Sequence, residues 1–444
     1  MSKIVVLGGG ESGVGAALLA KSKGFEVFLS DAGTLKESYQ NTLQENQIDF
    51  ESQQHTTEKI LEADEIIISP GIPEKADIVK AIKAAKISLI SEIEFAARYT
   101  QAKIIAITGS NGKTTTTLLT YHLLKEAGLK VGLAGNIGKS FAKQVMENEM
   151  EYYVIEISSF QLDRSFQFSP DVAVLLNITP DHLDRYEYKF ENYIFSKFRI
   201  FQNAKATTHC ITWQEDEVVN QYPKSIPAGI QHKISFKDSS ADAYISEEKI
   251  SFHGEWSLDR ETLPIKGPHN AINLSAAILA AESVGISADQ IRNALPTFQN
   301  AEHRLEPCGN WKGVQFINDS KATNVDAVYY ALNSFKTGII LIIGGVDKGN
   351  DYTVLNELVK EKVKAVVCLG TDNSKLMEHF GPIVSNIVST QNLKTAIEES
   401  AKWATEGDTI LLSPACASFD LFKNYEDRGT QFKQTVKAFI NEQN

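Results

Sequence analysis

The residues Gly109-Ser110-Asn111-Gly112-Lys113-Thr114-Thr115 have the composition of a phosphate-binding loop. They follow an apolar, β-branched run at 103–107 and precede a helix-compatible stretch at 115–127, which is the order of strand, loop and helix that such a loop requires. Backbone N–H groups and the helix N-terminus attract phosphate oxygens, and Lys113 adds a full positive charge. Thr114 is placed to ligate the Mg²⁺ of a nucleotide. The loop therefore predicts nucleotide binding, although the usual pattern has a glycine where this chain has Ile107.

A second group of polar residues follows other predicted strands. Asp181-His182-Leu183-Asp184 comes after the apolar run 171–176, and Glu156 ends the run 153–156. Ligands of open α/β sheets collect at the carboxyl ends of strands. A His-x-Asp turn alone is more often satisfied locally, but beside a phosphate-binding loop it favours a metal site, with Glu156 as an oxygen ligand for Mg²⁺ next to Thr114.

The N-terminus contains a glycine fingerprint. Residues 8–13 read G-x-G-x-x-G, and Asp31 ends the next predicted strand. This spacing is typical of dinucleotide binding, with the acid accepting a hydrogen bond from a ribose hydroxyl. An NAD-dependent oxidoreductase is therefore one reading, although it leaves the phosphate-binding loop unexplained.

Composition excludes several classes of protein. The 444 residues carry 44 Lys and Arg against 56 Asp and Glu, a formal charge of -12, which argues against nonspecific binding to nucleic acid. The four cysteines are scattered without a C-x-x-C pair, so neither zinc nor a disulfide framework is indicated. The chain enters a predicted strand directly and has no apolar run of membrane length. We expect a cytoplasmic protein that has no signal peptide and does not bind membranes.

Strand and helix patterns alternate in three blocks, which predicts α/β domains with mainly parallel, doubly wound sheets. We expect domains at 1–98, 99–301 and 302–444, in series, with the active site between them. Short alternating runs between 233 and 265 predict an antiparallel β insertion in the central block.

Taken together, these motifs resemble the ATP-dependent Mur ligases of bacterial cell-wall synthesis, and the resemblance covers nearly the whole chain. It is carried by the phosphate-binding loop and by the following segments: 135–138 (GNIG), 156–162 (EISSFQL), 181–186 (DHLDRY), 269–270 (HN), 303–304 (HR), 318–324 (NDSKATN) and 413–420 (SPACASFD). The family's shortened loop also lacks the early glycine, and this accounts for Ile107.

The resemblance is strongest to the members that add D-glutamate. It implies a Rossmann-like N-terminal domain that binds a UDP-sugar, a central P-loop ATPase-like domain, and a C-terminal Rossmann-like domain that binds the amino acid. The implied reaction uses ATP to join D-glutamate to UDP-N-acetylmuramoyl-L-alanine through an acyl phosphate, in peptidoglycan precursor synthesis. We expect a monomer.

The resemblance also implies roles for individual residues. The catalytic residues would be Lys113, His182, Lys197 and Arg304. ATP would contact Gly109, Ser110, Asn111, Gly112, Lys113, Thr114, Thr115, Asn270, Arg304 and Asp319. The UDP-sugar would contact Ser12, Asp31, Gly71, Asn136 and His182. D-glutamate would contact Lys321, Thr323, Lys348, Ser418 and Phe419. Two Mg²⁺ would be held by Thr114, Glu156, His182 and Lys197, the last as a carbamate formed with CO₂.

Two of these assignments depend on the resemblance, because the residues alone favour plainer readings. An imidazole is a poor ligand for Mg²⁺, and Lys197 reads equally well as a surface lysine. Besides the dehydrogenase, three alternatives stay open: a sister ligase with another amino-acid pocket, a folylpolyglutamate synthase, and a non-catalytic nucleotide-binding regulator. A sister enzyme that adds diaminopimelate is expected to carry an Asn-Pro-Arg type motif in the third block, which this chain lacks.

Overall fold

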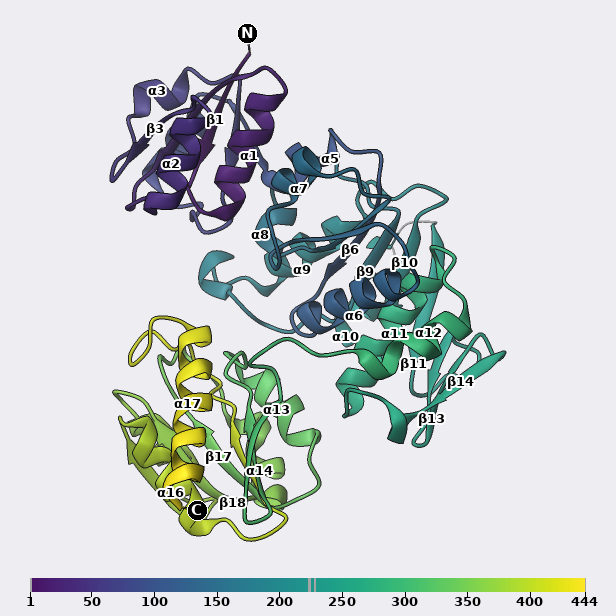
Figure 1. The fold of residues 1–444 in the computed structure, drawn as a ribbon, viewed down its shortest axis with the longest axis vertical. Helices are drawn as coiled ribbons and strands as arrows, with labels where there is room; N and C mark the ends of the chain where they lie inside the picture. The colour runs from purple at the N-terminus through teal and green to yellow at the C-terminus, as the bar shows by residue number, and fades with distance from the viewer. Residues whose placement is uncertain (1, 223–224, 227–228, 444) are drawn as a thin grey trace. The chain divides into compact units, whose positions relative to one another are not determined.

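The computed structural model describes residues 2–222, 225–226 and 229–443. The chain forms two compact units, one made of Met1–Pro264 and Ile272–Phe298 and the other of Ile265–Ala271 and Gln299–Asn444. The boundary falls within helix α11 (Pro268–Glu282). Each unit is described below by itself (Figure 1).

The first sheet of the first unit is entirely parallel, in the order β3-β2-β1-β4-β5. Its strands are β1 (Lys3–Leu7), β2 (Glu26–Asp31), β3 (Asp49–Ser52), β4 (Glu65–Ile68) and β5 (Ser88–Ser91). The helices between and after them are α1 (Glu11–Ser22), α2 (Glu37–Glu45), α3 (Thr57–Leu61), α4 (Asp77–Ala84) and α5 (Glu92–Ala97). The strand order reverses between β1 and β4, so a crevice for a ligand is expected at their carboxyl ends.

The second sheet of this unit has nine strands, in the order β14-β13-β12-β11-β10-β9-β6-β8-β7. They are β6 (Lys103–Thr108), β7 (Val131–Gly135), β8 (Tyr152–Glu156), β9 (Val172–Leu175), β10 (His209–Trp213), β11 (Ile230–Ser235), β12 (Ala243–Ile245), β13 (Lys249–Phe252) and β14 (Trp256–Asp259). Its helices are α6 (Lys113–Glu126), α7 (Phe141–Glu147), α8 (Ser159–Leu162), α9 (Phe190–Phe198), α10 (Glu217–Gln221), α11 and α12 (Ala288–Ala294).

Within the described residues of this sheet, antiparallel pairing is confined to β12, β13 and β14. The expected antiparallel insertion therefore needs correction at its start, because β11 pairs in parallel with both β10 and β12. These alternating runs therefore form strands that extend the main sheet at one edge.

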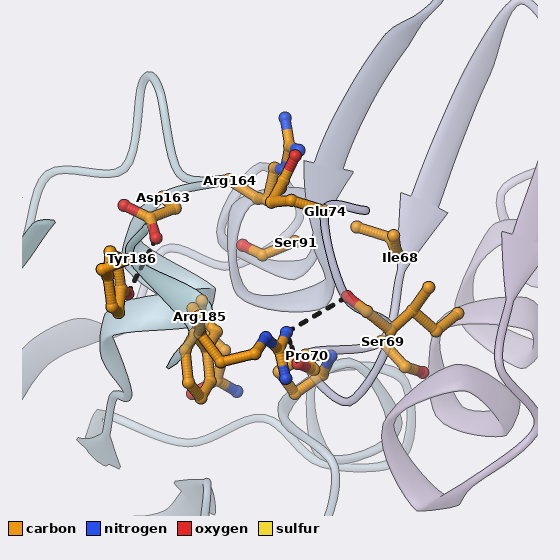
Figure 2. Close-up of a pocket in the computed structure, with 12 residues that line it drawn as sticks. Ile68, Ser69, Pro70, Glu74, Ser91, Asp163, Arg164, Arg185 and Tyr186 are labelled. Carbon is orange, nitrogen blue, oxygen red and sulfur yellow. Dashed lines mark hydrogen bonds and ion pairs between the residues drawn. The ribbon is translucent and has the colours of Figure 1, made fainter. Parts of the chain in front are cut away.

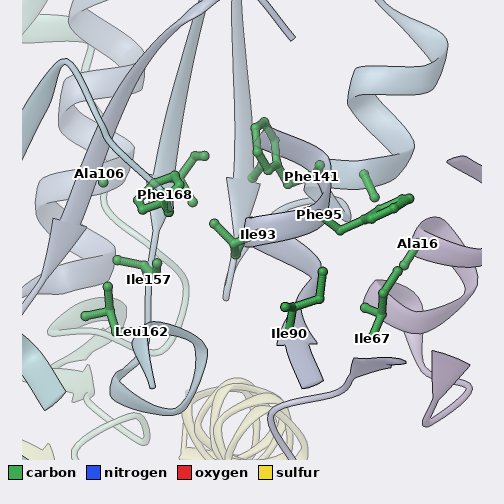
Figure 3. Close-up of a cluster of buried hydrophobic side chains, with 14 of the residues drawn as sticks. Ala16, Ile67, Ile90, Ile93, Phe95, Ala106, Phe141, Ile157, Leu162 and Phe168 are labelled. Carbon is green, nitrogen blue, oxygen red and sulfur yellow. The ribbon is translucent and has the colours of Figure 1, made fainter. Parts of the chain in front are cut away.

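One hydrophobic core joins the two sheets of this unit. Alternate residues of β1 point to opposite faces, so Ile4 and Val6 belong to this core while Val5 and Leu7 belong to a second one on the other face. Figure 3 shows side chains of the shared core, from Ala16 and Ile67 through Phe95 and Phe141 to Ile157. Burial on both faces is what a parallel sheet covered by helices requires.

The second unit contains a six-stranded sheet in the order β15-β16-β20-β17-β18-β19. The strands are β15 (Glu306–Trp311), β16 (Val314–Asn318), β17 (Ile339–Ile343), β18 (Val363–Leu369), β19 (Ile387–Thr390) and β20 (Thr409–Leu412), and only the β15–β16 pair is antiparallel. The helices are α13 (Val325–Asn333), α14 (Asn356–Lys362), α15 (Ser374–Phe380), α16 (Leu393–Trp403) and α17 (Tyr425–Gln443). Helices α13, α14 and α15 cover one face, and α16 and α17 cover the other (Figure 1).

The prediction of mostly parallel α/β sheets is confirmed. Strand β15 was not predicted, because its residues include Pro307 and Gly309 at a bulge and show no regular alternation. In the part of the chain that the structure describes, every helix is too short or too polar to cross a membrane.

Candidate active site

The phosphate-binding loop lies between β6 and α6, as its motif predicts. Gly112 caps α6 with a left-handed backbone (φ 86°), and a Cβ here would overlap the side-chain amide of Asn273. Asn177 holds the loop from the end of β9, since its Oδ1 accepts from Asn111 N at 2.8 Å and its Nδ2 donates to Asn111 O at 3.0 Å. The loop is thus pre-shaped by contacts from within its own unit.

The Lys113 ammonium is bonded to the loop itself. It donates to the carbonyl oxygens of Gly109 and Ser110, each at 2.8 Å. These bonds hold the charge above the loop, where a phosphate would be expected. The neighbouring Thr114 is buried, at 5% exposure.

Glu156 ends β8, directly beside β6, where it pairs in register with Ile107. Its Oε1 accepts from Asn136 Nδ2 at 2.8 Å. Its Oε2 is buried and has no hydrogen-bond partner among the described residues. A buried carboxylate oxygen without a partner is costly unless a ligand satisfies it, so this atom is a good candidate for cation binding.

Lys197 is buried, at 1% exposure, on α9. Its Nζ lies 4.7 Å from the centre of the Tyr193 ring. Burial lowers the pKa of this amine well below its usual value, and the nearby Lys113 charge lowers it further. The reading as a solvated surface lysine is therefore wrong.

His182 follows β9 in a left-handed conformation (φ 53°). Its side chain is 44% exposed, 3.6 Å from Asp181 Oδ2, and its ring packs edge-on against Phe160 at 5.2 Å. The imidazole thus stands just past the carboxyl end of β9, beside a carboxylate.

A cleft with an empty volume of about 820 Å³ brings many of these residues together. Its lining consists of Pro70, Gly71, Lys113, Asn136, Ser158, Ser159, Phe160, Asp181, His182, Arg185, Tyr193 and Lys197. Five of these are among the predicted site residues (Gly71, Lys113, Asn136, His182 and Lys197), and they come from both sheets of the first unit.

A smaller, adjacent pocket shares Pro70, Phe160 and Arg185 with the cleft. Figure 2 shows Arg185 reaching toward the turn that follows β4, where it donates to Pro70 O at 3.3 Å. Its guanidinium also lies 4.4 Å from the centre of the Phe160 ring. The arginine thus joins the turn after β4 to the loop after β9.

The glycine turn after β1 is held by a carboxylate. Asp31 accepts hydrogen bonds from Gly9 N at 2.5 Å and Gly33 N at 2.6 Å, so its carboxylate holds the glycine turn. Glu11, an awkward neighbour for a diphosphate, accepts from Tyr39 Oη at 3.0 Å. Ser12 and Asp31 do not line the cleft.

In the second unit, Asp319 is buried at the end of β16. Its oxygens accept from Leu305 N at 3.2 Å and from Ser413 Oγ at 2.9 Å. Burial raises the pKa of this carboxyl to about 6, against the lowering effect of Arg304. The Arg304 Nε is buried with no hydrogen-bond partner in the described chain.

His269 and Asn270 lie in the same unit. Burial, with a smaller contribution from Arg304, lowers the pKa of His269 to about 3, so the ring is neutral. Its Nδ1 has no hydrogen-bond partner among the described residues. Asn270 Nδ2 donates to Lys266 O at 2.8 Å.

The residues predicted for D-glutamate lie on three loops that follow β16, β17 and β20. Val346 N donates to Ala417 O at 2.8 Å, which places the loops carrying Lys348 and Ser418 side by side. Lys348 is exposed, Ser418 is buried and Phe419 is 70% exposed. Lys321 lies over the Tyr425 ring, and Thr323 is half-buried.

Sequence reasoning missed Arg428, which joins the same three loops. It is 1% exposed and donates to Ser320 O at 2.8 Å, to Cys416 O at 3.2 Å and to Gly344 O at 3.4 Å. Burial lowers its pKa to about 10. Arg428 lies in a polar segment at the start of α17, and the neighbouring residues give no sign that this arginine is buried.

Family models match three parts of the chain. The MurD N-terminal domain matches 3–78, the Mur ligase middle domain matches 107–281, and the glutamate ligase domain of Mur ligases matches 303–416.

Relatives named UDP-N-acetylmuramoylalanine--D-glutamate ligase match along the whole length. The one from Cytophaga hutchinsonii is 54% identical over 98% of each chain. That of Bacteroides fragilis is 50% identical over 98% of this chain and 100% of its own.

Solved structures of Mur ligases share the fold. The MurF ligase of Thermotoga maritima in complex with ADP has a TM-score of 0.64 at 16% identity, covering 96% of this chain and 99% of its own. The MurC ligase of the same organism has a TM-score of 0.63 at 18% identity, covering 99% and 100%. The models and the full-length relatives together show that this chain belongs to the Mur ligase family.

Proposed function

We propose that this protein is an ATP-dependent ligase that joins D-glutamate to UDP-N-acetylmuramoyl-L-alanine in peptidoglycan precursor synthesis. Its full-length relatives carry the name of that activity. The observation that carries the proposal is the cleft that Lys113 and the buried Lys197 both line.

ATP is the proposed phosphoryl donor. The loop from Gly109 to Thr115 would surround the β- and γ-phosphates, with Lys113 exchanging its carbonyl partners for phosphate oxygens. Asn270, Arg304 and Asp319 are the proposed contacts in the second unit. The unpartnered Arg304 Nε is suited to the charge that develops on the transferred group.

Mg²⁺ at the phosphate-binding loop would be held by a mixed set of donors. In the described chain, no group of three or more His, Cys, Asp or Glu side chains could hold a metal ion. The Thr114 hydroxyl and the unpartnered Glu156 Oε2 are oxygen donors of the kind that Mg²⁺ prefers, and phosphate oxygens would complete the set. Two bound Mg²⁺ would neutralise phosphate charge, with His182 and Lys197 as the proposed further ligands.

Lys197 is proposed to act as a carbamate. Its lowered pKa keeps a fraction of the amine neutral, and a neutral amine can attack CO₂, lose a proton and become a carbamate. The product is an anionic oxygen donor where an ammonium would repel a cation.

The proposed reaction has two steps. The γ-phosphate of ATP is transferred to the carboxylate of the alanyl group, giving an acyl phosphate and ADP. The amine of D-glutamate then attacks the acyl carbon, and the tetrahedral intermediate expels inorganic phosphate. Lys113 and Arg304 would stabilise the negative charge that spreads in the first step.

Substrate positions follow the same proposal. Gly71, Asn136 and His182 would contact the UDP-sugar directly, and Ser12 and Asp31 would do so at the glycine turn. Lys321, Thr323, Lys348, Ser418 and Phe419 would bind D-glutamate. The domain bounds 1–98, 99–301 and 302–444, the monomeric state and the cytoplasmic location remain predictions.

The alternatives gain no specific support. A dehydrogenase would use the glycine turn after β1 for NAD, but it would leave the phosphate-binding loop between β6 and α6 without a role.

Phosphate release is the direct assay of the function. With ATP, Mg²⁺ and UDP-N-acetylmuramoyl-L-alanine, we expect release that depends on D-glutamate and fails with L-glutamate, because the inverted α-carbon cannot satisfy both carboxylates and aim the amine. Comparable turnover with L-glutamate or a diamino acid would identify a sister activity.

A further inference from the structure

The loop that carries Lys348 is folded around its neighbour Asp347. The Asp347 Oδ1 accepts from Gly349 N at 2.6 Å and from Asn350 N at 2.9 Å, and its Oδ2 accepts from Tyr352 Oη at 2.8 Å. Gly349 takes a left-handed backbone (φ 88°) that closes the turn. This carboxylate therefore sets the path of the loop.

Lys375, at the start of α15, neutralises that carboxylate. Its Nζ lies 3.1 Å from Asp347 Oδ2 and donates to Asn350 O at 2.6 Å. It also lies 5.3 Å from the centre of the Tyr352 ring. Partial burial favours a higher pKa for Asp347, but its hydrogen bonds to Tyr352, Asn350, Lys375 and Gly349 outweigh burial and lower the pKa.

The same cluster reaches the loop that carries Ser418. Asn350 Nδ2 donates to Ala415 O at 3.1 Å, and Tyr352 Oη lies 3.3 Å from Cys416 Sγ. Tyr352 is 2% exposed, which makes it a fixed point for both loops. Two loops with proposed D-glutamate contacts are thus held by one set of side chains.

Lys348 itself is exposed, and no hydrogen bond or ion pair in the described residues involves its ammonium. A carboxylate one residue away would ordinarily compete for this charge. Because Asp347 is engaged by Lys375, the Lys348 ammonium stays available to an anionic ligand.

We propose that Asp347, Tyr352 and Lys375, here called the Asp347 cluster, are positioning residues for the amino-acid substrate. The cluster folds the loop so that Lys348 faces the substrate, and Lys375 masks a negative charge that would otherwise repel a dicarboxylate. This inference rests on the proposed function, since it needs an anionic amino acid at Lys348.

The test is a charge cycle measured by phosphate release with D-glutamate varied. Lys375→Met leaves the Asp347 charge without its cation, and we expect the KM for D-glutamate to rise about fivefold. The double variant Asp347→Asn with Lys375→Met removes the exposed charge as well, and we expect it to recover part of that loss. The KM values for ATP and the UDP-sugar should be unchanged in both.

Lys360→Met is the matched control, because Lys360 forms a similar exposed ion pair with Glu357 at 2.9 Å on α14. It should leave every KM unchanged. An unchanged KM for D-glutamate in Lys375→Met would overturn the inference, and so would a double variant worse than the single one, which would indicate loop damage alone. If the wild-type protein releases no phosphate in response to D-glutamate, the proposed function fails and this inference fails with it.

Discussion

Lys197 is the residue whose chemistry depends most on its surroundings. In water its amine would be an ammonium and inert toward CO₂, but burial on α9 and the nearby Lys113 lower its pKa. The Tyr193 ring, 4.7 Å from its Nζ, lines the same cleft. The residue therefore combines a reactive protonation state with access to the proposed phosphate site.

Replacement of Lys197 tests the carbamate. We expect Lys197→Arg to be nearly as inactive as Lys197→Ala, since an arginine keeps the positive charge but cannot form a carbamate. Acetate added to Lys197→Ala should restore part of the activity by supplying a carboxylate oxygen. Phosphate-release rates measure both effects, and a fully active Lys197→Arg enzyme would reject the carbamate.

Replacement of Lys113 tests the ATP site. Lys113→Ala should lose about a hundredfold or more in turnover, the usual cost of one lost charge contact to a transferring group. The thermal unfolding temperature should change little, because Lys113 is only half-buried. Normal ATP turnover in this variant would remove nucleotide binding from this loop.

Among the secondary-structure elements, the junction of α5 with α7 holds an ionisable group in the core. Glu92 opens α5, and its Oε1 accepts from Ser140 Oγ and from Ala142 N at the start of α7, both at 2.7 Å. Its Oε2 is buried without a partner in the described chain. Burial raises the pKa of this carboxyl to about 7, although these hydrogen bonds lower it.

A raised pKa in a folded acid predicts a loss of stability with increasing pH. The folded state binds the proton more tightly than the unfolded state, so the free energy of unfolding falls as pH rises from about 4.5 to about 7. The full contribution is at most about 3 kcal/mol. Denaturant unfolding of wild type and Glu92→Gln across this range measures it. The difference between the two proteins should change with pH, and a constant difference would contradict the assigned pKa.

The elements of the site were largely predictable, but the surroundings of single side chains were not. Strands β6, β8 and β9 follow from apolar runs. Lys113 follows from the strand–loop–helix motif, and Glu156 and His182 follow from their positions at or just past strand ends. The burial of Lys197 and Arg428 depends on contacts between segments distant in sequence. The hydrogen bond from Gly33 N to Asp31 was likewise not predictable, because the fingerprint indicates where Asp31 lies in the sequence but not which groups it bonds.

At the scale of the whole molecule, one chain carries two kinds of glycine loop. The first follows β1 and the second follows β6, each opening a helix. Because the glycine turn after β1 is held by Asp31, we expect the two loops to bind separate ligands and to respond separately to mutation.

Ligand titration tests this separation. We expect saturable binding of the UDP-sugar and no specific binding of NADH. Asp31→Ala should weaken the UDP-sugar by roughly tenfold, because the turn loses two charge-assisted hydrogen bonds, while the affinity for ATP stays the same. Specific binding of NADH, with none of the UDP-sugar, would contradict the ligase.

The bonds that Lys113 makes to Gly109 and Ser110 have a consequence for the heat of nucleotide binding. A phosphate that engages this ammonium replaces two existing hydrogen bonds. The enthalpy of nucleotide binding is therefore less negative than the formation of two new charged contacts alone would give. The carbonyl oxygens released must find water or other donors. Calorimetry should therefore record a modest exothermic signal, while discrimination between ADP and ATP depends on contacts beyond this lysine.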